Sequence, residues 1–303
     1  MRISDILKKR RRGFSFEYFP PKSEKTMEPF MAVVKDLGRY NPLYCSVTYG
    51  AGGTTHERTR DTLVELRRET GLTLMSHLTC IGATRELLDG LLRDYIENGI
   101  DNILALRGDP PQKEENFDPL KGEFRYAKDL VEFVKTYNNA FSISVAVYPE
   151  VHQESPSIEA DMEYTKRKID AGADFGITQM FFDNQYFYAF RDRAAKKGID
   201  IPIFPGIMPI TDLNKIMKFA SFCNATVPAR IRDRMEGVLD KPEEMEKIGT
   251  EIAIRQCEDL LDNGVDYLHF YTMNRAGVVG AILDALEGRF SNDAVSAGTA
   301  YAP

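Results

Sequence analysis

The stretch FSFEYFPPKSE, residues 14 to 24, is an aromatic run that ends in two prolines. Neither proline can continue the run as a helix or as a central strand, so a β-strand is expected to finish here. Glu17 lies among four aromatic residues of this strand. Because burying an unpaired carboxylate is costly, we expect Glu17 either to reach water or to have a chemical role.

Seven further β-rich runs follow, separated by helical patterns: 44–49, 74–80, 102–109, 142–148, 175–182, 201–207 and 267–272. Their starts are about thirty residues apart, the length of one βα unit, except for one long gap before the last. This pattern predicts an α/β protein with a single (β/α)8 TIM barrel, and extra helices between strands seven and eight within 209–266. A doubly wound open sheet is the alternative. The expected barrel domain covers 1–289, followed by a disordered tail over 290–303.

One helix has clear end signals in the sequence. Apolar residues recur at helical spacing over 158–169. Ser155 is the expected N-cap and Pro156 the expected first helical residue. Gly172 is the expected C-cap residue.

Composition excludes several classes of protein. The 303 residues are 43% apolar and 28% charged, with a net charge of −7, which is typical of a soluble enzyme and argues against a nucleic-acid partner. The basic run 8–12 is interpreted as the solvated end of a leading helix, with nucleic-acid contact less favoured. No apolar run suits a membrane span or a signal peptide. Four cysteines without C-x-x-C spacing indicate neither a zinc site nor a disulfide framework, so we expect a cytoplasmic protein.

Polar residues recur where the expected strands end. They are Glu17, Thr48, Tyr49, His77, Arg107, Gly108, Asp109, Tyr148, Gln179 and Thr272. Each alone is explained as a hydrogen-bonded strand-end residue, but in a barrel they converge on one rim, which predicts an active site. No lysine ends a strand, which disfavours Schiff-base chemistry, and no local motif supports a metal.

Two other features leave alternatives open. The glycines within 49–55 form either a flexible loop or a backbone surface for a flat or phosphorylated ligand. Asp161 and Lys168 share one helix face, as a solvated ion pair or as a cradle for a ribityl or phosphate group. Arg167 projects away from the apolar stripe of that helix.

Eight motifs occur in one order along the chain: FSFEYFPPK, SVTYGAGGTT, SHLTCIG, ILALRGDPP, VAVYPEVHQES, ITQMFFD, PGIMPI and HFYTMNRA. Together they resemble the catalytic domain of methylenetetrahydrofolate reductase, of the short, FAD-dependent bacterial type. The resemblance runs from about residue 3 to 288 and is carried by all eight motifs.

The resemblance implies an FAD-containing barrel that reduces 5,10-methylenetetrahydrofolate to 5-methyltetrahydrofolate in one-carbon metabolism, supplying methionine biosynthesis. NADH, or NADPH, would reduce the flavin and leave before the folate binds, in a ping-pong scheme. The implied partners are these small molecules and further copies of the chain, with a protein electron-donor subunit as an alternative donor.

The resemblance also implies roles for the two strand-end carboxylates. Glu17 matches the general acid that protonates the leaving nitrogen when the folate ring opens to an iminium. Its aromatic neighbours are expected to raise its pKa. Asp109 matches the aspartate beside the flavin and the pterin, where a negative charge favours hydride donation and stabilises a cationic iminium.

The remaining site residues are carried over from the same motifs. Thr48 matches a nicotinamide-side contact, and Gln179, Phe219 and Arg275 match substrate-side positions. The positions that match FAD contacts are Tyr49, Ala51, His77, Arg107, Gly108, Asp109, Ala127, Tyr148, His152, Asp161, Arg167 and Lys168. Two residues depart from the bacterial pattern: Lys215 stands where a glutamine is found, which leaves the electron donor open, and Tyr164 replaces an asparagine near the FAD.

Three rival functions remain on the same barrel. A flavin-free methyltransferase would bind methyltetrahydrofolate without a chromophore. A flavin dehydrogenase of the proline type would ignore folate. A non-catalytic folate-binding protein would need neither strand-end carboxylate.

Overall fold

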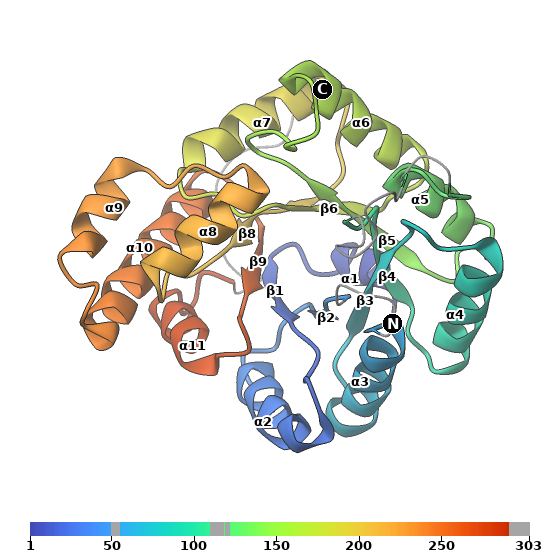
Figure 1. The fold of residues 1–303 in the computed structure, drawn as a ribbon, viewed down its shortest axis with the longest axis horizontal. Helices are drawn as coiled ribbons and strands as arrows, with labels where there is room; N and C mark the ends of the chain where they lie inside the picture. The colour runs from blue at the N-terminus through green and yellow to red at the C-terminus, as the bar shows by residue number, and fades with distance from the viewer. Residues whose placement is uncertain (50–54, 110–117, 119–121, 291–303) are drawn as a thin grey trace.

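A computed structural model describes residues 1–49, 55–109, 118 and 122–290, and in this part parallel strands form a ring surrounded by helices (Figure 1). The strands are β1 (Gly13–Tyr18), β2 (Tyr44–Val47), β3 (Leu74–Thr79), β4 (Asn102–Leu106), β5 (Ser142–Val147), β6 (Phe175–Thr178), β7 (Ile203–Phe204), β8 (Gly206–Ile207) and β9 (Tyr267–Tyr271). The helices are α1 (Ile3–Leu7), η1 (Glu24–Thr26), α2 (Met27–Gly38), α3 (Thr55–Thr70), α4 (Arg85–Glu97), α5 (Ala127–Lys135), α6 (Ile158–Asp170), α7 (Asn184–Lys196), α8 (Leu213–Cys223), α9 (Ala229–Glu236), α10 (Pro242–Asp262) and α11 (Ala276–Ala285).

The ring closes at the seventh expected strand, which is split into two short pieces. β7 pairs with β6, and β8 pairs with β9, all in parallel. Pro205 lies between the pieces and has no N–H to donate, but its carbonyl accepts a hydrogen bond of 2.9 Å from the backbone N–H of His269. The predicted (β/α)8 barrel is therefore confirmed, with nine assigned strands because the seventh is interrupted.

Gly206 makes this closure possible. Its backbone N–H donates to Thr178 Oγ1 at 2.8 Å, and a Cβ added to it would lie 2.5 Å from the Thr178 carbonyl oxygen. Only glycine lets the two strands approach this closely.

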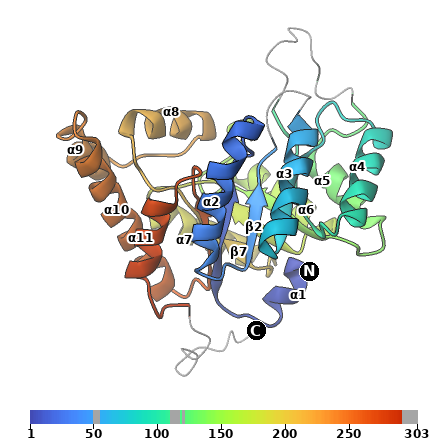
Figure 2. The same ribbon diagram turned by 90° about the horizontal axis from the view of Figure 1, so that it is seen from below.

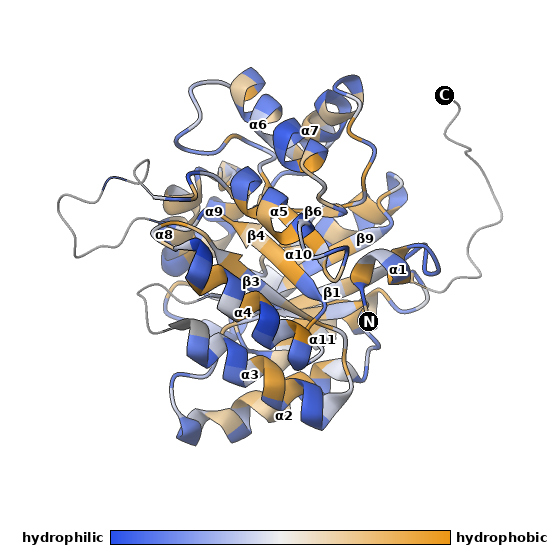
Figure 3. Cartoon of the chain, turned by 90° about the vertical axis from the view of Figure 1, so that its right-hand side faces the viewer, coloured by the Kyte–Doolittle hydropathy of each residue, from blue (hydrophilic) through white to orange (hydrophobic). Residues whose placement is uncertain are grey.

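The core has two layers, set by the alternation of side chains along each strand. Outward-facing residues such as Phe14, Phe16 and Tyr18 pack under the helices, for example against Phe30 of α2. Inward-facing residues near the strand starts form a separate apolar cluster. In Figure 3, which is coloured by hydropathy, β4 and β6 are orange, whereas α2 and α3 carry both colours, as expected for buried strands and for helices with one solvated face.

Helix α1 covers the end of the barrel at which the strands begin (Figure 2). Ile3 and Ile6 are buried in the inward cluster, together with Tyr44 and Phe204. The basic run that follows α1 is largely solvated, as expected, with the Lys8 side chain 73% exposed.

The chain between β8 and β9 builds the expected extra helices, α8, α9 and α10. They share a small apolar core with the segment after β6. This core includes Met180 and Phe182 from that segment, Ile216 from α8 and Met245 from α10. Helix α8 lies on the side of the barrel opposite α1 (Figure 2). At the other end of the chain, Phe290 packs on Phe14 with ring centroids 4.9 Å apart, and the rest of the expected tail lies outside the described residues.

The helix expected over 158–169 is confirmed as α6, but its N-cap prediction is wrong. Ser157 caps the helix by accepting from the backbone N–H of Ala160, so Pro156 lies before the helix. The Ser155 hydroxyl instead donates to Asp161 Oδ1 at 2.7 Å. The C-cap residue is Ala171, one residue before the predicted Gly172, and Gly172 follows it with φ of 116°.

Candidate active site

Glu17 lies inside the barrel at the carboxyl end of β1, with its side chain 14% exposed. The alternation of β1 sends its aromatic side chains in the other direction, so Phe16 and Tyr18 are fully buried beneath the helices. The expectation that these aromatic residues surround Glu17 is therefore wrong. Its neighbours come from other strands.

Two histidines flank the carboxylate. Glu17 Oε2 lies 3.4 Å from His77 Nε2 of β3 and 3.5 Å from His269 Nε2 of β9. The other ring nitrogen of His269, Nδ1, lies 2.8 Å from the hydroxyl of Ser15. A proton on Nε2 lets His269 donate to Glu17 while Nδ1 accepts from Ser15, so one tautomer satisfies both contacts. Ser15, His269 and Glu17 thus form a hydrogen-bonded chain inside the barrel.

The pKa of Glu17 is set by opposing effects. Burial raises it, but the charge of His77 and the hydrogen bond from His269 outweigh burial and hold it below its ordinary value. Burial lowers the pKa of His77 to about 4. The expected rise in the Glu17 pKa is therefore wrong for the ligand-free protein, because the histidines take the place of the aromatic wall.

His77 is incompletely paired. Among the described residues, its buried Nε2 has no hydrogen-bond partner of acceptable geometry, although it lies close to Glu17. A buried polar atom left in this state costs stability unless a ligand uses it. His77 was predicted from its strand end, and the structure places it beside Glu17.

Sequence reasoning missed Ser15 and His269. Both are fully buried polar residues, and they are Cα partners in the pairing of β1 with β9. A signal was available for Ser15 alone: it lies two residues from Glu17, so period-2 alternation places both on the same inward face.

A second group of predicted residues meets around Tyr148. The His152 ring packs edge-on against Tyr148 at 4.7 Å, and Lys168 Nζ lies 5.6 Å from the Tyr148 ring centroid. Lys168 also donates to the carbonyl of Ala146 at 2.5 Å. Burial lowers the pKa of Lys168 to about 8, although Asp161 counteracts this. The predicted shared face of Asp161 and Lys168 therefore points toward the barrel.

Arg107 extends this group at the end of β4. Its two terminal nitrogens each contact a Glu154 oxygen at 2.6 Å, a bidentate pair. The next residue, Gly108, has φ of 88°, and a Cβ there would lie 2.9 Å from side-chain atoms of Ile81 and Thr79. A glycine is required at this turn, and it leaves the backbone open to close approach.

Other predicted residues lie on the same rim with fewer contacts. Gln179 follows β6, and its side-chain oxygen accepts from the Met180 N–H at 2.8 Å. Thr48 follows β2 and donates its N–H to the Tyr18 carbonyl. Burial raises the pKa of Tyr49. Asp109 is exposed after β4, Ala127 is the first residue of α5, and Ala51 lies outside the described residues.

The structure does not bring three predicted residues into these groups. Arg167 is 58% exposed and pairs with Glu163, as its place on the helix indicated. Phe219 is partly buried on α8 against the separate core of that region. Arg275, at the N-cap of α11, is half exposed and forms an ion pair with Glu246 of α10.

The two departures from the bacterial pattern are also at the surface. Lys215 is 74% exposed and pairs with Asp212, and Tyr164 is 46% exposed. Within the described ranges, no three His, Cys, Asp or Glu side chains are grouped as metal ligands. No helix in the described part of the chain is long and apolar enough to cross a membrane.

A closed (β/α)8 barrel with convergent acidic, basic and imidazole side chains at its strand ends defines a barrel enzyme. Comparison with known proteins narrows this class. The methylenetetrahydrofolate reductase family model matches residues 2–287. A 5,10-methylenetetrahydrofolate reductase of Pectobacterium carotovorum is 42% identical over 272 residues, covering 90% of this chain and 89% of that protein. The chain therefore belongs to the methylenetetrahydrofolate reductase family and is an oxidoreductase.

Other relatives agree. The 5,10-methylenetetrahydrofolate reductase of Escherichia coli is 41% identical over 273 residues, covering 90% of each chain. Methylenetetrahydrofolate reductase 2 of Saccharomyces cerevisiae is 38% identical over 298 residues, covering 94% of this chain and 50% of that protein. Among solved structures, an uncharacterized Clostridium thermocellum protein that binds two copies of 5-methyl-5,6,7,8-tetrahydrofolic acid has a TM-score of 0.61 at 12% identity, covering 96% of this chain and 99% of that one. This last likeness supports the fold.

Proposed function

We propose that this protein is an FAD-dependent enzyme that reduces 5,10-methylenetetrahydrofolate to 5-methyltetrahydrofolate, with Glu17 as the general acid. The observation that carries the proposal is the placement of the Glu17 carboxylate inside the barrel, between two imidazoles, at the strand ends where barrel enzymes hold their substrates.

Glu17 supplies the proton that opens the folate ring. Protonation of the leaving nitrogen breaks its bond to the methylene carbon and yields an iminium, and a hydride added to that carbon completes the methyl group. Burial is the largest single influence on the Glu17 pKa, and it raises that pKa. A flat substrate that covers the remaining 14% exposure of the side chain would strengthen this effect and favour the protonated acid.

His269 and Ser15 hold the carboxylate in place. The imidazole lies within 3.5 Å of Glu17, and Ser15 contacts its other ring nitrogen at 2.8 Å. Ser15 and His269 are fully buried, so the hydrogen bonds from Glu17 through His269 to Ser15 lead into the barrel interior. The substrate therefore approaches Glu17 from the opposite side, where the carboxylate is exposed.

The donor set around Tyr148 fits FAD. Lys168, Arg107 and His152 supply groups that can bind phosphate oxygens, and Asp161 can accept from ribityl hydroxyls. The turn at Gly108 adds a backbone surface for a flat ring, and His77 Nε2, which has no hydrogen-bond partner among the described residues, adds a donor. When bound, the flavin supplies hydride transfer.

The remaining roles complete the proposal. Asp109 would contact the pterin and favour the cationic iminium, Gln179 would bind the folate, and Arg275 would bind a folate carboxylate. Phe219 and Thr48 would contact the nicotinamide, which is NADH or NADPH. We also propose that the protein is cytoplasmic and homo-oligomeric, with a partner electron-donor subunit as the alternative source of electrons.

Anaerobic absorbance of the purified protein tests the function. The flavin band near ~450 nm should bleach on addition of NADH or NADPH and recover on addition of 5,10-methylenetetrahydrofolate. A yellow protein that neither nicotinamide bleaches, but that 5-methyltetrahydrofolate reduces, would replace the nicotinamide with a protein donor. A colourless protein that cannot be reconstituted with FAD would overturn the proposal in favour of the methyltransferase.

A further inference from the structure

The turn between β9 and α11 is bonded directly to the end of β1. We call it the 272–274 turn. Thr272 donates twice to the backbone carbonyl of Glu17, from its N–H at 3.2 Å and from its hydroxyl at 2.6 Å. The carbonyl of the general acid therefore has both of its lone pairs engaged by one residue.

Asn274 makes a second, two-point attachment two residues further along β1. Its side-chain oxygen accepts from the Phe19 N–H at 2.9 Å, and its amide nitrogen donates to the Phe19 carbonyl at 2.9 Å. Pro20 and Pro21 follow directly and have no N–H. The Asn274 amide thus replaces the strand pairing that the prolines end, at the place where the strand would otherwise fray.

The conformation of the 272–274 turn is unusual. Met273 and Asn274 both adopt left-handed backbone conformations, with φ of 51° and 54°. Consecutive non-glycine residues in this region are uncommon; the described residues contain a second such pair, Asn138 and Asn139, between α5 and β5. The Thr272 hydroxyl accepts from the Asn274 N–H at 3.1 Å, which joins the two attachments into one unit.

We propose that Asn274 is a positioning residue for the proton transfer, acting through the backbone of Glu17 and of Phe19, two residues further on. This inference rests on the proposed function. The Glu17 carboxylate contacts two histidines at 3.4 and 3.5 Å, so a small shift of the β1 end changes both contacts and the direction of the acid. The turn also continues into Arg275, whose N–H donates to the Thr272 carbonyl at 2.9 Å, so the acid and this arginine are held at a fixed spacing.

Asn274→Gly tests the inference, because glycine keeps the left-handed backbone and removes the amide. The folate half-reaction should slow roughly ten- to hundredfold, as expected for a misplaced acid, while flavin reduction by the nicotinamide keeps its wild-type rate. Hydrogen–deuterium exchange should rise in a peptide covering 17–22, where the Phe19 N–H loses its acceptor. Asn138→Gly, at φ of 52° on the other side of the barrel after α5, is the matched control and should change neither readout.

Thr272→Val provides a second variant that keeps the side-chain shape and removes the hydroxyl. Thr272→Val should also slow the folate half-reaction. In a Glu17→Gln background, neither Asn274→Gly nor Thr272→Val should slow that half-reaction further. Equal slowing of both half-reactions, or an unchanged folate half-reaction with raised exchange at 17–22, would overturn the inference. If the wild-type protein itself lacks the folate half-reaction, it is the proposed function that fails, and the exchange result still reports on the turn.

Discussion

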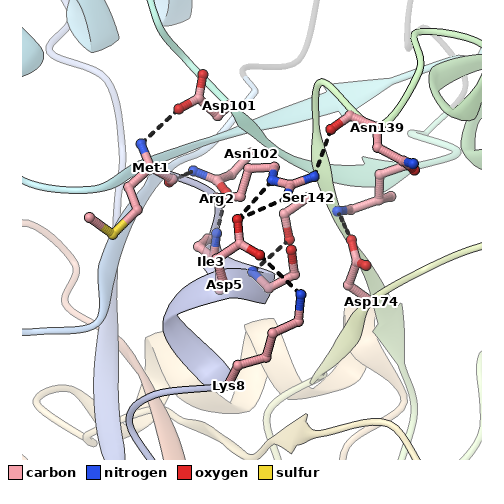
Figure 4. A network of polar contacts seen from close by, with 12 residues as sticks. Met1, Arg2, Ile3, Asp5, Lys8, Asp101, Asn102, Asn139, Ser142 and Asp174 are labelled. Atoms are coloured by element: carbon pink, nitrogen blue, oxygen red, sulfur yellow. Dashed lines mark hydrogen bonds and ion pairs between the residues drawn. The ribbon is translucent and has the colours of Figure 1, made fainter.

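The two ends of the barrel are built in opposite ways. At the end closed by α1, apolar side chains fill the interior and the buried Asn102 side chain is well paired. It accepts from the Ile3 N–H at 2.7 Å and donates to the carbonyl of Met1 (Figure 4) and to that of Leu74. At the opposite end, the buried Nε2 of His77 has no good partner among the described residues and lies beside the Glu17 carboxylate.

This difference separates stability from function within one fold. The α1 end is a packed apolar core, and the Asn102 side chain there pairs with backbone groups from two other segments. The opposite end retains the incompletely paired His77 among its described residues. The free energy of folding lost there is recovered only when a ligand binds. Substitutions at the two ends should therefore fail in different assays, and each prediction below tests this separation.

The largest effect is expected from Glu17→Gln. Loss of the acid should reduce the rate of the folate half-reaction by ~10²- to 10⁴-fold, with FAD still bound and still reduced by the nicotinamide. Stopped-flow absorbance of the two half-reactions measures this. Asp101→Asn, a carboxylate change at the α1 end, is the control, and normal folate turnover in Glu17→Gln would remove Glu17 from its role.

Asn102→Ala should have the reverse outcome. It leaves buried backbone groups without partners and opens a cavity, so the free energy of unfolding should fall by about 2–4 kcal/mol. Urea unfolding monitors the stability, and both half-reactions should keep their rates at temperatures where the variant is folded. If Asn102→Ala is folded but either half-reaction is slowed, the separation of stability and function between the two ends is contradicted.

The pH dependence of stability should identify His77. Because its pKa falls from 6.5 to about 4 on folding, the unfolded chain binds more protons between these values, and stability falls as the pH is lowered through this window, by up to roughly 3 kcal/mol. Glu17 acts in a lower window, because its lowered pKa stabilises the fold until the pH falls below 4.5. Urea unfolding from pH 7 to 4 should show a flatter profile for His77→Gln, and an unchanged profile would exclude the burial effect.

The smallest effect concerns two adjacent cations of α6. Lys168→Met should weaken FAD retention roughly ten- to hundredfold, the range for losing a hydrogen bond to a charged group, whereas Arg167→Met should change little because its exposed pair with Glu163 contributes little. Flavin retention should also weaken above pH 8, where Lys168 loses its charge. Equilibrium dialysis measures the FAD affinity of each variant and its pH dependence. Equal losses of affinity in Lys168→Met and Arg167→Met would show that Lys168 does not bind FAD.

The sequence predicted the barrel well because each βα unit carries its own local pattern. The run 142–148, for example, coincides with β5 and needs no information from distant residues. Prediction failed where the outcome depends on a neighbour. The seventh strand is split at Pro205, which has no N–H to donate, and its two pieces pair with different neighbours, β7 with β6 and β8 with β9. Ser157 caps the helix, whereas the expected cap, Ser155, donates to Asp161.

The site shows the same limit. Strand-end position correctly placed Glu17 and His77 together, but the sequence alone did not show which strands meet across the barrel. His269 and Ser15 were missed because they lie 254 residues apart in the chain and touch only after the ring closes. For the same reason the pKa of Glu17 was predicted from its sequence neighbours rather than from its neighbours in space.

By itself, the sequence determined the order of strands and helices, the family resemblance and the residues that end each strand, since these depend on local patterns of hydrophobicity and turn chemistry. Only the tertiary structure decided the seam of the barrel, the partners of Glu17 and the attachment of the 272–274 turn to β1. These depend on contacts between distant segments, and strand alternation assigns a side chain to a face without saying what lies opposite.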